Sequence, residues 1–182
     1  MRRRRFGQWL SPHRVHRSLA EIDLDELAAH GIRGILMDLD DTLCPRDSSV
    51  TPEPIMVWLK AAAERFQLFI VSNNFSLERV RIVSDALSIP GIHGAQKPRR
   101  SGINHAMTQL GLQRHELVLI GDRLLTDVLA SRRAGIMAIL VEPILAERRF
   151  LSLGVRLLEA NLLRLFGETP FQRHDPPAGA DS

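Results

Sequence analysis

The chain has 182 residues, enough for one domain with a substantial buried core. Its 45% hydrophobic and 25% charged residues are ordinary for a globular protein, and its net charge is +3. Tyrosine is absent and aromatic residues make up only 5%, which argues against a surface that stacks many nucleic-acid bases, and the single cysteine, Cys44, excludes an intrachain disulfide.

The first 17 residues hold six arginines and no acidic residue, with Phe6 and Trp9 among them. No apolar run of the kind found in signal peptides follows this charged start. No segment reaches the ~18 consecutive apolar residues of a membrane-spanning helix. We therefore expect residues 1–22 to form a basic N-terminal arm of a cytoplasmic protein that is neither exported nor membrane-spanning.

Short apolar runs alternate with helical patterns from residue 23 to residue 145. The first predicted helix spans residues 24–30, with Asp23 in a capping position and Gly31 just past its end. Predicted strands span residues 32–38, 68–71, 92–95, 117–120 and 137–141, and the helices between them span 54–66, 77–87, 101–110 and 124–134. This alternation predicts an α/β domain with a three-layer Rossmann-like fold, in which helices cover both faces of a parallel sheet.

The sequence changes character after Pro143. Apolar residues interleave with arginines between Phe150 and Phe166, which predicts an amphipathic helix within a C-terminal segment of residues 146–166. Residues 167–182 include three prolines and two glycines and have a polar end, so we expect them to be disordered.

Polar side chains follow four of the predicted strands. They are Asp38, Asp40, Asp41 and Thr42 after the first strand, Ser72 and Asn73 after the second, Lys97 after the third, and Asp122 and Asp127 after the fourth. The carboxyl ends of parallel strands meet at one edge of a sheet, where ligands bind. Carboxylates gathered there repel one another unless a cation offsets them, and Mg²⁺ prefers such oxygen ligands. The sequence therefore predicts a Mg²⁺ site that uses the side chains of Asp38 and Asp122 and the backbone carbonyl of Asp40.

These residues resemble the four motifs of the haloacid dehalogenase (HAD) superfamily. The stretches that carry the resemblance are Asp38-Leu39-Asp40-Asp41-Thr42-Leu43, Ser72, Lys97 and Gly121-Asp122-Arg123-Leu124-Leu125-Thr126-Asp127. Each one follows the strand after which that fold carries it. The resemblance implies a Mg²⁺-dependent phosphatase that forms an aspartyl-phosphate intermediate.

The resemblance also implies a role for each motif residue. Asp38 is expected to be the nucleophile, and Asp40 the general acid that protonates the leaving group and then the base that activates water. Ser72 and Lys97 are expected to hold the phosphoryl group, and Asp122 to be the second metal carboxylate. Asp127 is expected to hold Lys97 or a water on the metal.

The role of several neighbouring residues can be interpreted in two ways. Asp41 stands where many relatives have Asn, and it either caps the turn or contributes to the chemistry. Thr42 binds either the loop or the phosphate, and Asn73 either contacts substrate or caps the following helix. Cys44 is expected to be a packing residue.

The spacing between motifs leaves no room for a large cap domain. Only 29 residues separate Thr42 from Ser72, and only 24 separate Ser72 from Lys97. The finer pattern, which includes Gly31-Ile32-Arg33-Gly34-Ile35, Ser72-Asn73-Asn74 and Lys97-Pro98, is similar to subclass IIIA. That group includes small bacterial phosphatases of the YqeG type and the mitochondrial phosphatidylglycerophosphate phosphatase, and the similarity extends over about residues 8–166.

Three hypotheses for the function follow. The first is that the protein removes the terminal phosphate of phosphatidylglycerophosphate, an anionic phospholipid, as a peripheral protein on the membrane surface. In that case the basic arm and the 150–166 helix either lie on the membrane or pack on the domain. The second is a soluble phosphomonoester, such as a nucleotide, a sugar phosphate or a phosphoprotein. The third, nucleic-acid binding on a HAD scaffold, is disfavoured by the few aromatic residues. Candidate headgroup contacts are Arg46, Arg79, Arg99 and Arg100, of which Arg99 and Arg100 come first because they follow Lys97.

Overall fold

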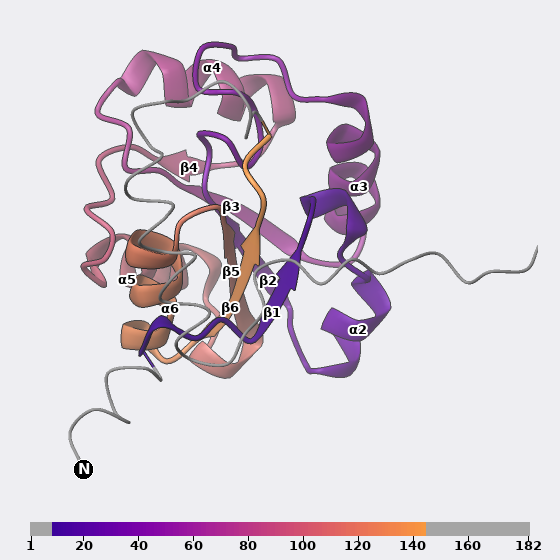
Figure 1. The fold of residues 1–182 in the computed structure, drawn as a ribbon, viewed down its shortest axis with the longest axis vertical. Helices are drawn as coiled ribbons and strands as arrows, with labels where there is room; N and C mark the ends of the chain where they lie inside the picture. The colour runs from indigo at the N-terminus through magenta and orange to yellow at the C-terminus, as the bar shows by residue number, and fades with distance from the viewer. Residues whose placement is uncertain (1–8, 145–182) are drawn as a thin grey trace, which may run out of the picture.

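Six parallel strands form one sheet in the order β1-β6-β5-β2-β3-β4 (Figure 1). The structure is a computed structural model, and it describes residues 9–144. The strands are β1 (Arg14–His16), β2 (Gly34–Met37), β3 (Gln67–Val71), β4 (Gly91–Ile92), β5 (Leu117–Gly121) and β6 (Met137–Val141). The helices are α2 (Leu24–Ala29), α3 (Glu53–Ala63), α4 (Leu77–Leu87), α5 (Ser101–Leu110) and α6 (Leu129–Ala134). Short helical turns are η1 (Leu19–Glu21), η2 (Arg114–Glu116) and η3 (Leu124–Val128).

Successive side chains of each strand point to opposite faces of the sheet, and both faces are buried. Ile35 and Met37 of β2 belong to a core cluster that also contains side chains of η1, α2, α3 and α4. Leu36, between them, packs with side chains of α5 and α6 on the other face. This arrangement confirms the predicted three-layer α/β fold. No inserted cap domain interrupts the described residues.

Strand β1 was not predicted, and it places part of the expected basic arm in the sheet. The N–H of His13 donates to the carbonyl of Ala138 at 2.8 Å, and the N–H of Ala138 donates to Nδ1 of the His13 ring at 2.9 Å. The pairing with β6 continues from Arg14. Leu10 and Leu19 are buried on either side of this strand. A three-residue edge strand held mainly through its backbone leaves almost no hydrophobic pattern, which explains why the sequence did not reveal it.

Two other elements differ from the expected ones. The predicted helix 124–134 begins as a π-helical turn, η3, and becomes α-helical only at Leu129. The predicted strand 92–95 pairs over only two residues, Gly91 and Ile92. Residues 1–8, the segment 146–166 with its predicted helix 150–166, and the tail 167–182 lie outside the described residues. None of the helices among the described residues combines the length and apolar character needed to cross a membrane.

Candidate active site

The loop after β2 brings Asp38 and Asp40 to the carboxyl edge of the sheet. The backbone N–H of Asp38 still donates to the carbonyl of Ile120 at 2.9 Å, so the β2–β5 pairing extends to this residue. The chain then turns at Asp41, whose φ of 65° is left-handed and is tolerated by Asp and Asn. The N–H of Asp41 donates to the carbonyl of Cys44, and its Oδ1 accepts from the N–H of Arg46. Asp41 therefore shapes the turn that presents its two acidic neighbours.

Lys97 joins two of the predicted motifs through its ammonium group. Its Nζ lies 2.6 Å from Oδ1 of Asp38 and 2.7 Å from Oδ1 of Asp127, and all three side chains are buried. Burial alone lowers the pKa of Lys97, but the carboxylates of Asp127 and Asp38 together raise it above its usual value, so the group is an ammonium. The lysine is held by Asn73, whose Nδ2 donates to the Lys97 carbonyl at 2.8 Å and whose Oδ1 accepts from the Lys97 N–H at 2.7 Å.

Asp127 reaches this position because of Gly121 and η3. A side chain at Gly121 would place a Cβ 2.4 Å from Cγ of Asp127, so only glycine leaves room for the carboxylate. The π-helical turn begins at Leu124, directly after Asp122 and Arg123. The N–H of Arg123 donates to Oδ2 of Asp127 at 3.0 Å, which fixes the second carboxylate oxygen.

Three carboxylates form a buried cluster that fits a divalent cation. One oxygen from each of Asp38, Asp122 and Asp127 lies within 4.8 Å of the others. Oδ1 of Asp122 is buried and has no hydrogen-bond donor among the described residues. Burial, followed by the charges of Asp38 and Asp127, raises the pKa of Asp122 well above its usual value. Burial likewise raises the pKa of Asp38 to about 6, although the charge of Lys97 opposes this shift. A bound divalent cation would remove this electrostatic penalty and give the orphaned oxygen a partner.

Asp40 has partners that the sequence did not indicate. Nε and Nη2 of Arg79 each lie 2.9 Å from Oδ1 of Asp40, and Nδ2 of Asn74 donates to Oδ2 at 2.8 Å. Nη2 of Arg79 also donates to the carbonyl of Pro45 at 2.8 Å. Arg79, expected as a headgroup contact, is thus already bound to Asp40. No local motif marks this pairing, because α4 brings the arginine to the loop from 39 residues away.

A cavity of about 400 Å³ opens above these groups. Its lining comprises Asp38, Asp40, Arg46, Asn73, Asn74, Phe75, Lys97, Arg123, Thr126 and Asp127. Ser72 and Thr42 are buried and are not part of this lining. Oγ of Ser72 accepts from the N–H of Asn74 at 3.0 Å, and Oγ1 of Thr42 has no partner among the described residues. Arg99 and Arg100, the first sequence candidates for substrate contact, are exposed and lie outside this lining.

Comparisons with known proteins place this site in a family. The family model described as "Mitochondrial PGP phosphatase" matches residues 7–145, a span that includes every residue of the site described above. The chain belongs to this phosphatase family. It is 33% identical over 153 residues to "Probable phosphatase YqeG" of Bacillus subtilis, a match that covers 84% of this chain and 88% of that protein. These matches confirm the prediction that the chain is a HAD-family phosphatase similar to YqeG and to phosphatidylglycerophosphate phosphatases, and therefore an enzyme.

A longer relative and a solved structure complete the comparison. The chain is 27% identical over 174 residues to "Phosphatidylglycerophosphate phosphatase 1, chloroplastic/mitochondrial" of Arabidopsis thaliana; the match covers 86% of this chain but only 48% of that protein. The chain thus spans about half the length of this curated plant relative. The crystal structure of an uncharacterized protein from Listeria monocytogenes serotype 4b superimposes with a TM-score of 0.53 at 17% identity, covering 73% of this chain and 99% of that one. At that identity the likeness supports the fold alone.

Proposed function

We propose that this phosphatase hydrolyses a phosphomonoester through an aspartyl-phosphate on Asp38, with Mg²⁺ as cofactor and phosphatidylglycerophosphate as substrate. The observation that carries the chemistry is the contact of Lys97 with both Asp38 and Asp127 beside the orphaned Oδ1 of Asp122. A lysine and a divalent cation together balance the charge of the three carboxylates, so that an incoming phosphate is no longer repelled by uncompensated carboxylates. The residues that meet at this point, Asp38, Lys97, Asp122 and Asp127, all belong to the motifs that the sequence singled out.

In the first step, Asp38 attacks the phosphorus atom. Lys97 holds Oδ1 of Asp38 at 2.6 Å, which orients the carboxylate and leaves Oδ2 to form the new P–O bond. The ester P–O bond breaks, and the leaving oxygen takes a proton from Asp40. The hydroxyls of Ser72 and Thr42, which are both buried and follow β3 and β2, supply hydrogen bonds to the phosphoryl oxygens.

In the second step, Asp40 takes a proton from a water molecule, which attacks the phosphorus of the aspartyl-phosphate. The P–O bond to Asp38 breaks, and the Asp38 carboxylate is restored as inorganic phosphate leaves. Arg79 and Asn74 position Asp40 for both transfers. Asp40 must release the hydrogen bond of at least one oxygen to carry the proton, and the open cavity allows this movement.

The metal would be held by the side chains of Asp38 and Asp122, with Asp40 adding its backbone carbonyl. When bound, Mg²⁺ supplies Lewis-acid stabilisation of the charge that develops on the phosphoryl oxygens. Asp127 then serves mainly through Lys97, which it keeps charged and close to Asp38.

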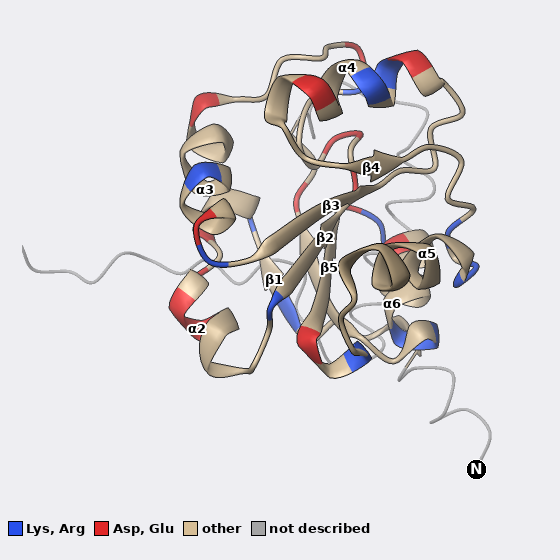
Figure 2. Ribbon diagram, turned by 180° about the vertical axis from the view of Figure 1, so that it is seen from behind, with Lys and Arg blue, Asp and Glu red and all other residues tan. Residues whose placement is uncertain are grey.

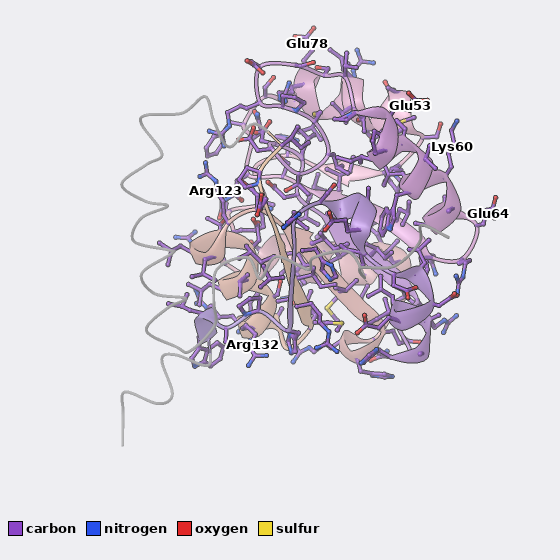
Figure 3. All side chains as sticks on the ribbon, turned by 45° about the vertical axis from the view of Figure 1, so that its right-hand side comes forward. Glu53, Lys60, Glu64, Glu78, Arg123 and Arg132 are labelled. Carbon is purple, nitrogen blue, oxygen red and sulfur yellow. The ribbon has the colours of Figure 1, made fainter. Side chains whose placement is uncertain are left out.

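The lipid substrate is supported by the name of the family and by the charges around the cavity. Arg46 and Arg123 both line the cavity, and their side chains are 40% and 39% exposed. Phosphatidylglycerophosphate carries a phosphodiester beyond its terminal phosphate, and two arginines at the mouth suit that second anion. Arg123 lies at the left-hand edge of the protein body in Figure 3. The cavity is also open enough for a soluble phosphomonoester, so substrate choice is the point to test.

The test is phosphate release from phosphatidylglycerophosphate in mixed micelles, beside a panel of soluble phosphomonoesters, with and without Mg²⁺. Asp38→Asn is compared with Asp41→Asn, the same chemical change three residues away at a position whose left-handed φ suits Asn. We expect Asp38→Asn to abolish turnover and Asp41→Asn to retain it. Acid quenching of a single turnover with ³²P-labelled substrate should trap label on the wild-type protein.

The outcomes separate the parts of the proposal. Faster turnover of soluble esters than of the lipid would keep the chemistry and overturn the substrate. Full activity in Asp38→Asn, or full activity after complete chelation of divalent cations, would overturn the mechanism.

A further inference from the structure

Exposed apolar side chains lie on two segments that also contribute to the lining of the catalytic cavity, the loop between β2 and α3 and the segment that leads from β3 into α4. Phe75, which lines the cavity, is 85% exposed, Leu77 is 60% exposed and Val50 is 73% exposed. Val50 belongs to the loop between β2 and α3, and its neighbour Ser49 lies 3.5 Å from Arg79 of α4. The loop runs beside α4 at the top of Figure 1. With Ile82, these side chains make up four of the six large hydrophobic residues that are exposed within residues 9–144.

Cationic side chains stand inside this apolar rim. Arg46 and Arg123 line the cavity and are partly exposed, while the carboxylates of Asp38 and Asp122 lie buried beneath them. In Figure 2, α4 carries both basic and acidic residues above the strand ends. Apolar side chains that protrude around a mouth lined by cations match a surface with anionic groups above hydrocarbon.

We propose that the rim formed by Val50, Phe75 and Leu77 docks the enzyme onto an anionic phospholipid bilayer, with the cavity facing the headgroups. This inference deepens the proposed function, because it rests on a lipid phosphate as the substrate. A bilayer suits the rim better than a second copy of the chain. A symmetric dimer through this face would close the catalytic cavity and bring the arginines of both copies together.

The rim also explains how a lipid phosphate reaches buried carboxylates. Apolar side chains that enter the interface bring the cavity mouth to the level of the headgroups, so the lipid need not leave the bilayer. Glu78, in the first turn of α4, points outward at the top of Figure 3 and is the acidic residue nearest in sequence to this rim. Its charge opposes docking on an anionic surface.

The experiment is co-sedimentation of the full chain with vesicles of phosphatidylcholine alone or mixed with phosphatidylglycerol. Phe75→Ser and the double variant Val50→Ser/Leu77→Ser are compared with Val57→Ser, a matched control on α3 with 63% exposure. We expect each rim variant to bind mixed vesicles about tenfold more weakly or worse, because burying one such side chain is worth at least a factor of ten. Val57→Ser should bind as wild type does, and Glu78→Gln should bind mixed vesicles more tightly.

Activity separates this inference from the proposed function. Val50→Ser/Leu77→Ser should hydrolyse a soluble phosphomonoester at the wild-type rate and lose turnover of lipid in vesicles. Unchanged vesicle binding by the rim variants would overturn the docking surface even if the lipid proves to be the substrate. Rim-dependent vesicle binding by an enzyme that hydrolyses only soluble esters would keep the surface and overturn the substrate. Self-association that the rim variants abolish, without vesicle binding, would identify a second copy as the occupant and overturn the proposal.

Discussion

The two ends of the strands in the sheet differ in whether their charged side chains are buried or exposed. At the carboxyl ends of the strands, charged and polar side chains are buried; eight of the nine buried polar residues among residues 9–144 lie there, and the ninth is Ser131. At the amino ends, charges stay at the surface. Arg33, just before β2, pairs with Glu116, just before β5, at 2.8 Å, and the arginine side chain is 66% exposed.

The difference separates charges that serve chemistry from charges that serve solubility. Removing Asp38, Asp122, Asp127 and Lys97 from water is costly, and their mutual contacts offset only part of that cost. An exposed pair such as Arg33–Glu116 costs little and contributes little. A fold keeps the expensive arrangement only where the buried charges do something that exposed ones cannot.

The largest expected effect follows from removing the lysine between the buried carboxylates. Lys97→Met should lower the free energy of unfolding without metal by about 3–5 kcal/mol, because Asp38 and Asp127 lose their shared cation. Mg²⁺ should recover part of this loss, and phosphatase activity should fall at least about a hundredfold. Urea unfolding with and without Mg²⁺ measures the effect. Arg33→Met is the control at the opposite end, and equal stability of the two variants would refute the contrast between the ends.

Gly121→Ala should disturb the site through sterics alone. The new Cβ would lie 2.4 Å from Cγ of Asp127, so the carboxylate must move away from Lys97. We expect a loss of about 1–3 kcal/mol in stability and about tenfold or more in kcat. Gly111→Ala is the control for general destabilisation: its φ of 65° is strained in alanine, but a Cβ there has no neighbour within 4 Å. Similar activity losses in both variants would mean that general destabilisation, and not the position of Asp127, explains them.

Arg79→Lys should affect turnover more than stability. Lysine keeps the charge but cannot present two N–H groups to Oδ1 of Asp40, so the general acid is less well positioned. We expect kcat to fall about tenfold with KM for a soluble ester little changed. Arg81→Lys on the same helix, where the arginine forms an exposed pair with Asp85, should match wild type. A rise in KM with unchanged kcat would instead assign Arg79 to substrate binding.

The smallest effect concerns Cys44, which is buried at the catalytic end but has no place in the chemistry. Burial raises the pKa of its thiol to about 11, against the opposing charge of Arg79, so the thiol stays protonated at neutral pH. Alkylation by iodoacetamide at pH 8 should therefore be at least about a hundredfold slower in the native protein than in urea, and it should accelerate as the pH rises. Rapid alkylation of the native protein would show that the thiol is accessible and activated.

The sequence by itself determined the fold class and the motif residues. Buried strands of a parallel sheet are continuous apolar runs, and Asp38, Ser72 and Asp122 each follow such a run directly. Lys97 comes five residues after the short strand β4, and the parallel topology brings all four residues to one edge. The contact between Asp127 and Lys97 was also anticipated, since it belongs to the same motifs.

Only the tertiary structure decided the contacts between residues that are far apart in the sequence and that no motif links. Arg79 reaches Asp40 because α4 packs against the loop after β2, and no periodicity records that meeting. Asn73 turned out to bind the backbone of Lys97, and Arg46 and Arg123, instead of Arg99 and Arg100, line the cavity. Strand β1 escaped prediction for the same reason: a short edge strand depends on backbone hydrogen bonds to a distant partner, and backbone groups are identical in every residue but proline.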